Sequence, residues 1–244
     1  MAYIYNTEVS SHDIDINDFA KPSSVLRYLQ DAANKNFSAK GLSYSELLEK
    51  NLSFIVSRSA IKVLRPLKTE EKLTVETWAS KNSGVIFPRS YRIKIGNETV
   101  VESVMQWALV NTETKSFVKG SEFDISYLGT DEVLEIDMPT RFKIPKEVNL
   151  NLVGTKEVRY SDIDKNLHMN NTIYPNVLFD FIPSRENLFM SSMLINFVSE
   201  APYGKTIEIY MSDIIEDNDE LIYYFRTMID GKTNIESMMK VRHI

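Results

Sequence analysis

The chain contains an internal repeat, and this repeat limits the folds that it can adopt. Three segments recur in the same order in both halves: residues 13–15 with 162–164, 61–66 with 195–202, and 96–105 with 231–239. The offset is 149 positions at the first match and about 135 at the later two, so about a dozen residues are missing from the helical section of the second half. A common order with one consistent deletion indicates a duplicated unit.

Hydrophobic patterning predicts one set of elements in each unit. A strand-like segment at Tyr3 precedes a helix that begins near Pro22, where apolar residues recur at helical spacing, and a short helical piece covers residues 44–48. Strand signals follow, with short Asn, Ser and Gly turns between them, at residues 54–64, 73–79, 86–95 and 99–110. Short turns join antiparallel strands. We therefore expect one long helix and about four antiparallel strands in each half.

This arrangement predicts an α+β fold made of two helix-plus-antiparallel-sheet repeats. A helix that covers one face of a curled antiparallel sheet is an α+β unit. Two such units can pair edge to edge into one continuous sheet, which removes exposed edge strands. The N-terminal repeat would cover residues 1–122 and the C-terminal repeat residues 150–244. Residues 123–149, where the periodic pattern dissolves, would form a linker or a wrapped extended segment.

Composition indicates an ordinary globular chain, with 43% hydrophobic and 25% charged residues. The absence of cysteine excludes disulfides, a thiolate nucleophile and a cysteine metal site. No apolar run approaches the ~20 residues of a membrane span, and residues 1–9 lack the features of a signal peptide. We expect a cytoplasmic protein without stable membrane insertion.

The charge distribution is uneven. A net charge of −6 argues against nucleic acid as the main partner. Residues 51–94 nevertheless carry nine Lys or Arg against three Glu, a window of +6 that leaves −12 on the remainder. Solvated strand faces are the commoner explanation of such a window, and a docking surface for an acidic partner is the alternative.

The run from Tyr160 to Asn171 carries the candidate chemistry. Asp164, Asn166 and His168 lie at alternate positions just before an apolar segment. An asparagine at the end of the run can cap the following helix, which would place the cluster at a helix N-terminus that attracts negative charge. Taken singly, an Asp or Asn is more often a turn or cap residue, and a lone His before a helix is usually a surface residue.

The segment from residue 159 to 174 resembles the catalytic segment of the acyl-acyl carrier protein thioesterases of plants and bacteria. The family pattern runs Trp-Ser-Asp-Leu-Asp, any residue, Asn, any residue, His-Val-Asn-Asn, with a Tyr a few residues later, and this chain reads Tyr-Ser-Asp-Ile-Asp-Lys-Asn-Leu-His-Met-Asn-Asn-Thr-Ile-Tyr. The first half is similar too, at Ser57-Arg58, at Pro66 and at the Glu-Thr-Trp strand that ends with Trp78. The resemblance covers nearly the whole chain and is weakest in the linker. It implies a tandem (double) hot-dog fold of the bacterial type, since no transit extension precedes residue 1.

The resemblance also implies the site residues, which are Asp164, Asn166, His168 and, on the strand after the motif, Glu200. Plant members carry a Glu-Cys pair on that strand, but Ala201 replaces the Cys in this chain. A cysteine nucleophile is therefore excluded and an activated water is expected.

The repeat implies a single active site. Phe19 stands opposite His168, and Leu64 opposite Glu200, so the first half has apolar residues where the chemistry would be. The first repeat would then serve the acyl chain. Candidate walls of its apolar slot are Val25, Leu26, Leu29, Ala33, Phe54, Val56 and Trp78.

Two assignments of the proton acceptor stay open. Either His168 takes the proton of the water while Glu200 orients it, or Glu200 takes the proton while His168 orients the water, with acid–base help of roughly 10²–10⁴-fold. Asn166 can hold the water or the thioester carbonyl, and Asp164 can orient its neighbours or bind water. Backbone N–H groups at residues 169–171 could form an oxyanion hole.

We predict a thioesterase that releases free fatty acid from acyl carrier protein, without cofactor or metal, since no second His lies near enough for a ligand set. The alternatives are an acyl-coenzyme A thioesterase, a hot-dog hydratase or dehydratase, and a non-catalytic acyl-binding protein. A homodimer is compatible with the sequence, which leaves the oligomeric state and the acyl chain length open.

Overall fold

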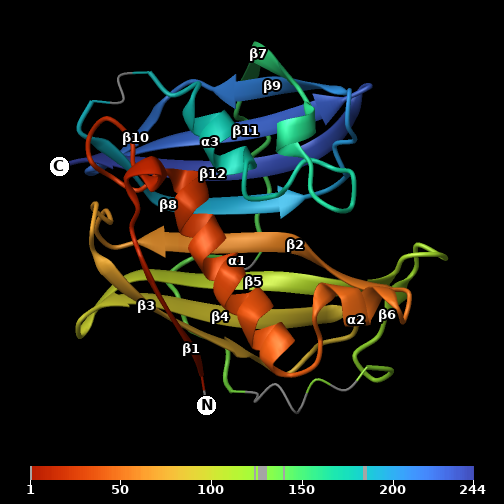
Figure 1. The fold of residues 1–244 in the computed structure, drawn as a ribbon. Helices are drawn as coiled ribbons and strands as arrows, with labels where there is room; N and C mark the ends of the chain where they lie inside the picture. The colour runs from red at the N-terminus through yellow and green to blue at the C-terminus, as the bar shows by residue number, and fades with distance from the viewer. Residues whose placement is uncertain (1, 124, 126–130, 140, 184–185) are drawn as a thin grey trace.

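The computed structural model describes residues 2–123, 125, 131–139, 141–183 and 186–244, whose strands form one sheet (Figure 1). The N-terminal repeat contains β1 (Tyr3–Glu8), α1 (Pro22–Ala39), α2 (Tyr44–Leu48), β2 (Leu52–Val63), β3 (Lys72–Ala79), β4 (Ile86–Ile95), β5 (Glu98–Asn111) and β6 (Phe117–Val118). The C-terminal repeat contains β7 (Leu150–Glu157), α3 (Tyr174–Phe179), β8 (Leu188–Phe197), β9 (Thr206–Ser212), β10 (Ile215–Asp217), β11 (Glu220–Ile229) and β12 (Lys232–His243). The paired strands of the described residues run antiparallel, and the α+β class is confirmed.

The strand order is symmetric about its centre. It runs β1-β3-β4-β5-β2-β8-β12-β11-β9-β7, so the second repeat mirrors the order of the first. β2 pairs with β8 at the junction, where Ala60 lies opposite Leu194. These two residues are themselves equivalent in the repeat, because they are 134 positions apart. A pseudo-two-fold axis therefore passes between them, and the continuous sheet predicted from the repeat is confirmed.

Equivalent contacts give the offsets of the repeat. The Asp15 N–H donates to the Phe19 carbonyl at 2.8 Å, and the Asp164 N–H donates to the His168 carbonyl at 3.0 Å, an offset of 149. Cross-strand ion pairs join Arg92 to Glu102 and Arg226 to Glu236, an offset of 134. Since the offset falls from 149 to 134, 15 residues are missing between these points.

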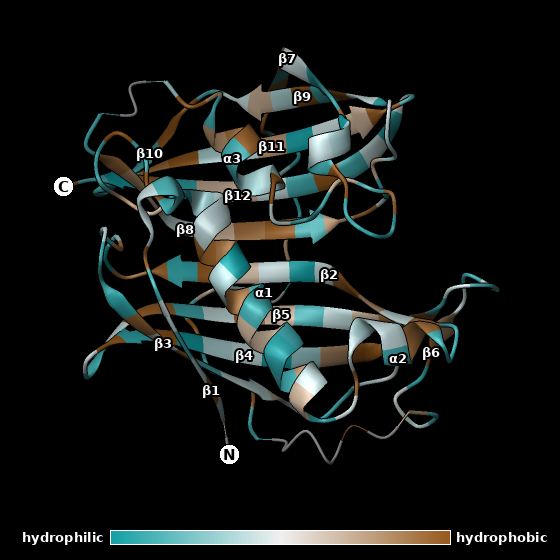
Figure 2. Cartoon of the chain, viewed as in Figure 1, coloured by the Kyte–Doolittle hydropathy of each residue, from teal (hydrophilic) through white to brown (hydrophobic). Residues whose placement is uncertain are grey.

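The missing residues come from the helical section. α1 has 18 residues and lies across one face of the sheet (Figures 1 and 2), whereas α3 has six. The expectation of one long helix in each half is therefore wrong for the second repeat. α1 compensates by reaching over the junction, where the Ser23 N–H donates to the Asn176 side chain of α3 at 2.9 Å. Its buried Leu26 and Leu29 join the main core, which covers both repeats.

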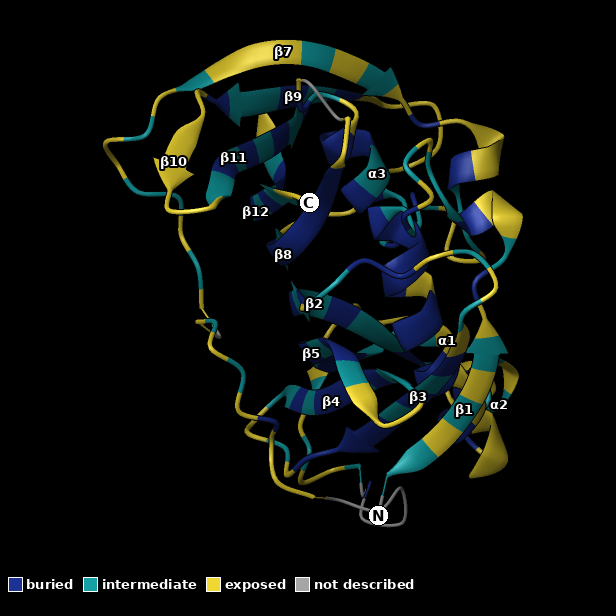
Figure 3. Ribbon diagram, turned by 90° about the vertical axis from the view of Figure 1, so that its left-hand side faces the viewer, coloured by how far each residue is buried: buried dark blue, intermediate teal, exposed yellow. Residues whose placement is uncertain are grey.

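The described part of residues 123–149 is an extended segment that wraps around the sheet, which is the second of the two arrangements expected for it. Residues 131–139 and 141–149 cross the face of the sheet opposite α1 (Figure 3), and we call them the strap. The Trp78 indole donates to the Glu132 carbonyl at 2.7 Å, and the Asn196 amide donates to the Phe142 carbonyl at 2.9 Å. Residues 124, 126–130 and 140 of the predicted linker lie outside the described residues.

Trp78 belongs to the strap face. It packs in a separate small cluster with Val104 and Leu134, while Leu73 and Val75 of the same strand enter the main core beneath α1. Successive residues of a strand point to opposite faces. Trp78 is therefore not a wall of a slot beneath α1, and this sequence prediction is wrong. None of the described helices combines the length and the apolar content that a membrane crossing requires.

Gly154 of β7 permits a close approach of the Phe181 ring to the backbone. A Cβ atom added at Gly154 would lie 2.5 Å from Cε1 of Phe181, a residue that packs against the core. We expect Gly154→Ala to displace this ring and to lower the free energy of unfolding by about 1–3 kcal/mol. Urea unfolding measures this change. Thr155→Ala, at the exposed neighbouring position, is the control, and equal midpoints for both variants would contradict the packing described.

Candidate active site

A tight turn presents His168. The Asp164 side chain accepts a hydrogen bond from the Asn166 N–H at 2.8 Å, and a backbone bridge joins Ile163 to Met169. Leu167, at the turn's tip, has a φ of 63°, a conformation that is uncommon for a residue with a side chain. Asp18 has a φ of 61° at the equivalent place in the first repeat. Both repeats therefore build the same turn.

A second loop brings Glu200 to the first. The Met169 N–H donates to the Ala201 carbonyl at 2.9 Å, and His168 forms a backbone bridge with Pro202. As a result Nε2 of His168 lies 3.0 Å from Oε2 of Glu200, with side chains 27% and 66% exposed. His168 and Glu200 are thus in contact, with the imidazole half-buried and the carboxylate open to water.

Asp164 and Asn166 lie in the same turn but bond to other partners. The Asn166 side-chain oxygen accepts a hydrogen bond from the Tyr44 hydroxyl at 2.9 Å. Asp164 holds the turn through the Asn166 N–H. Among the described residues, neither side chain forms a hydrogen bond with the His168 imidazole. The four predicted residues therefore gather on two adjacent loops, with the His–Glu pair as one contact and the Asp–Asn turn as another.

Tyr44 was not predicted from the sequence. It lies on α2 of the first repeat, and the Lys165 ammonium sits 5.2 Å from the centroid of its ring. Burial and then the charge of Asp164 raise the pKa of Tyr44 above its ordinary value. Nothing in the sequence indicates this contact, because only the pairing of the two repeats brings residue 44 beside residue 166.

The predicted helix cap is not formed, and two of the three N–H groups predicted for an oxyanion hole are engaged elsewhere. α3 begins at Tyr174, and Asn170 accepts hydrogen bonds from the Thr172 N–H and hydroxyl instead of capping the helix. The Met169 N–H donates to the Ala201 carbonyl, and the Asn170 N–H donates to the Asp162 carbonyl. The first bond joins the two loops and the second closes the loop that carries His168, so neither N–H group is left for an oxyanion.

The first repeat carries an apolar counterpart of the site. Phe19 occupies the place of His168, as predicted, and its ring packs edge-on against Phe189 with centroids 6.4 Å apart. The Ala20 N–H donates to the Leu67 carbonyl, just as the Met169 N–H donates to the Ala201 carbonyl. Pro66, and not Leu64, is therefore opposite Glu200. The sequence alignment was two residues out of register because the offset here is 134.

Most cations of the basic window are paired or buried. Arg89 is only 2% exposed and donates to the side chains of Thr77 and Asn36. Four others face acids within 4 Å: Lys62 with Asp137, Arg65 with Glu71, Arg92 with Glu102, and Lys94 with Glu76. The structure thus favours solvated, internally paired strand faces over a free basic docking surface.

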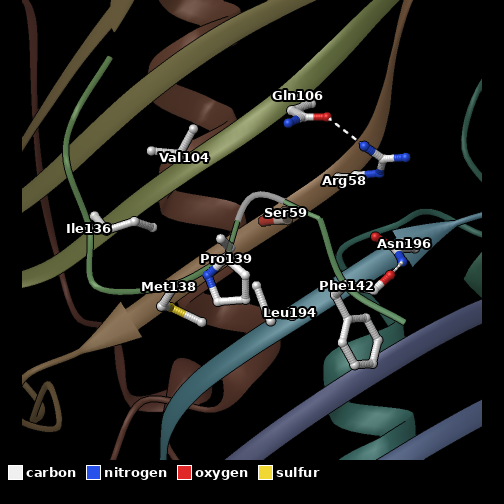
Figure 4. Close-up of a pocket in the computed structure, with 11 residues that line it drawn as sticks. Arg58, Ser59, Val104, Gln106, Ile136, Met138, Pro139, Phe142, Leu194 and Asn196 are labelled. Atoms are coloured by element: carbon white, nitrogen blue, oxygen red, sulfur yellow. Dashed lines mark hydrogen bonds between the residues drawn. The ribbon is translucent and has the colours of Figure 1, made fainter. Parts of the chain in front are cut away.

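Two hollows lie beside the strap. The first, of about 20 Å³, is lined by residues that include Ile136, Met138, Pro139 and Phe142 of the strap (Figure 4). The second, of about 250 Å³, is lined by residues that include Lys62, Lys240 and Arg242. Beneath α1, the candidate wall residues Val25, Leu26, Leu29 and Ala33 are buried in the core. No group of three or more carboxylate or imidazole side chains in the described ranges converges as a metal-binding set would.

Two family models together match most of the chain. The family model of the acyl-ACP thioesterase N-terminal domain matches residues 1–122, and that of the C-terminal domain matches residues 146–243. A chloroplastic palmitoyl-acyl carrier protein thioesterase of Arabidopsis thaliana is 24% identical over 196 residues, which are 75% of this chain and 48% of that protein. The chain spans 48% to 62% of the length of the first three curated relatives.

Solved structures match the fold over its whole length. The crystal structure of an acyl-ACP thioesterase from Bacteroides thetaiotaomicron has a TM-score of 0.86 and 21% identity, and the match covers 99% of this chain and 98% of that one. A 12:0-ACP thioesterase from Umbellularia californica has a TM-score of 0.84 and 16% identity, covering 100% and 94%. The double hot-dog fold that the resemblance implied is confirmed.

The electrostatic link between Asp164 and Tyr44 can be measured. A nearby anion disfavours the phenolate and raises the pKa of a tyrosine. Asp164→Asn removes that charge, so the pKa of Tyr44 should fall toward its ordinary value while the effect of burial persists. An NMR titration of the ring carbons gives the value. Tyr210, whose pKa is raised by burial and Glu208, is the internal reference, and an unchanged Tyr44 pKa would contradict the contact.

Proposed function

Because the chain belongs to the acyl-acyl carrier protein thioesterase family, we propose that it hydrolyses fatty acyl-acyl carrier protein to free fatty acid and acyl carrier protein. The observation that carries the proposal is the contact of His168 with Glu200 at 3.0 Å. An imidazole beside an accessible carboxylate can activate water, and the equivalent place in the first repeat holds Phe19 and Pro66.

The reaction adds water to the thioester carbonyl and expels a thiol. We assign the proton acceptor to His168. Nε2 faces Glu200, so the Nε2–H donates to that carboxylate and Nδ1 keeps the basic lone pair. As the water oxygen bonds to the carbonyl carbon, its proton passes to Nδ1, and Glu200 stabilises the imidazolium. The carbon–sulfur bond then breaks, and His168 returns the proton to the sulfur.

The carbonyl oxygen needs a hydrogen-bond donor as its charge develops. Asn166 is the candidate, since its side-chain oxygen is occupied by Tyr44 and its NH₂ group remains for the substrate. Asp164 holds the turn in which Asn166 lies. One such donor is typically worth ~10²–10³-fold in rate. This donor takes the place of the N–H groups of Met169 and Asn170, which are bonded to backbone carbonyls.

The two repeats divide the work in this proposal. Residues 150–244 supply the catalytic groups, residues 123–149 connect the repeats, and residues 1–122 accommodate the acyl chain between α1 and the sheet. The side chains of Leu26 and Leu29 on α1 and of Val56 on β2 are buried in the core between α1 and the sheet. The internally paired basic window does not favour a carrier protein over coenzyme A, so the carrier preference is taken from the family.

Thiol release from a panel of acyl carrier protein thioesters tests the proposal. We expect the wild type to release thiol and free fatty acid, and His168→Ala to be slower by roughly 10²–10⁴-fold because the proton acceptor is lost. His243→Ala, at an exposed chain end, is the matched control. Full activity in His168→Ala would contradict the mechanism. Acyl-coenzyme A thioesters of equal chain length test the carrier, and turnover of crotonyl thioester without thiol release would favour a hydratase instead.

Glu200→Gln separates the two assignments of the proton acceptor. Glutamine can still accept the hydrogen bond from Nε2–H but cannot take a proton. If His168 is the acceptor, this variant retains clearly more activity than His168→Ala, because only the charge that stabilises the imidazolium is lost. If Glu200 takes the proton, Glu200→Gln falls at least as far as His168→Ala. The kcat values of the two variants, measured on one substrate, decide between these outcomes.

A further inference from the structure

One contact joins the catalytic turn of the second repeat to the first repeat. The Tyr44 hydroxyl of α2 donates to the side-chain oxygen of Asn166 at 2.9 Å, although the residues lie 122 positions apart. The Lys165 ammonium covers the face of the same ring at 5.2 Å, a favourable cation–π arrangement. Lys165 and Asn166, two successive residues of the turn, therefore both contact the side chain of Tyr44 in the other repeat.

α2 is held firmly enough to serve as a support. The Ser43 N–H donates to the Glu46 carboxylate at 2.7 Å, and the Glu46 N–H donates back to the Ser43 hydroxyl, which caps the helix. Leu47, one turn on, is buried in the core of the first repeat. The position of the Tyr44 hydroxyl is thus set by the first repeat and not by the catalytic turn.

The apolar counterpart of the site uses the same device. There the side-chain oxygen of Asn17 accepts a hydrogen bond from the Asn187 N–H, at 3.0 Å, and Asn187 belongs to the second repeat. Each turn thus has its asparagine oxygen held by a donor from the opposite repeat. Beside Phe19 the donor is a backbone amide, whereas beside His168 it is a side-chain hydroxyl. The recurrence indicates that this contact is part of the architecture and not an incidental surface bond.

The bond determines which end of the Asn166 amide is available. A carboxamide presents an oxygen acceptor at one end and an NH₂ donor at the other. With the oxygen held by Tyr44, the NH₂ group is the end left for a ligand. A rotated amide would offer its oxygen to the thioester carbonyl oxygen, and two acceptors repel. The Tyr44 hydroxyl is protonated at neutral pH and can donate, and burial, which raises its pKa, acts in the same direction.

We propose that Tyr44 is a positioning residue, which orients the Asn166 amide so that its NH₂ group faces the thioester carbonyl, and that the active site is therefore completed by both repeats. This inference rests on the proposed hydrolysis for its kinetic consequences. Its geometric content, the orientation of Asn166, holds for any ligand that the turn binds.

Steady-state kinetics on an acyl carrier protein thioester test the proposal. Tyr44→Phe should lower kcat by about three- to tenfold, the effect of one lost hydrogen bond. KM and the thermal midpoint should not change. Because Tyr44 acts through Asn166, the double variant Tyr44→Phe/Asn166→Ala should be no slower than Asn166→Ala alone. Tyr160→Phe, which alters an 80% exposed tyrosine at the start of the same run, is the matched control and should behave as wild type.

Two results would overturn the proposal. An unchanged kcat in Tyr44→Phe would do so, and so would additive losses in the double variant, since they mean that Tyr44 does not act through Asn166. A second measurement separates this failure from that of the proposed function. In the full chain, the NMR signals of the Asn166 side-chain NH₂ should shift in Tyr44→Phe and not in Tyr160→Phe. If the wild type hydrolyses nothing, shifted signals still support the positioning, and unchanged signals refute it.

Discussion

The pairing of β2 with β8 is the interaction on which the rest of the structure depends. It joins two half-sheets whose inner edges would otherwise expose unpaired N–H and C=O groups, and it does so about an axis through Ala60 and Leu194. The same pairing lets α1 reach α3 across the junction. It also brings α2 against the turn that carries His168. A single register between two strands thus sets the core and the composition of the candidate site.

The two repeats build one turn and use it differently. Asp15 and Asp164 accept the same backbone hydrogen bond, and the residues that follow adopt the same rare conformation. In the first repeat the turn ends in Phe19, whose ring packs against the ring of Phe189. In the second it ends in His168, which meets Glu200 beside solvent. The turn is therefore a structural part of the repeat, and the chemistry comes from two side chains placed on it.

Much of this was accessible from the sequence. The strand signals of the first half predicted β2, β3, β4 and β5 within one or two residues, because side chains along a strand alternate between two faces of different burial. The internal repeat predicted the continuous sheet. The match of residues 13–15 with 162–164 predicted that Phe19 takes the place of His168. The predicted counterpart of Glu200 was wrong by two residues, because short matches in strands tolerate such a slip, and the backbone bonds assign Pro66 instead of Leu64. The prediction of a helix cap was wrong, because the Asn170 side chain accepts hydrogen bonds from Thr172 and α3 begins only at Tyr174.

The sequence by itself determined the elements, the duplication and the four polar residues of the candidate site, since these follow from local periodicity and from a motif that is contiguous along most of its length. Only the tertiary structure decided which groups meet. Tyr44 donates to Asn166, Trp78 faces the strap, and the Met169 N–H donates to the Ala201 carbonyl of the second loop. Each of these depends on contacts between segments far apart in the chain, and such contacts leave no local pattern in the sequence.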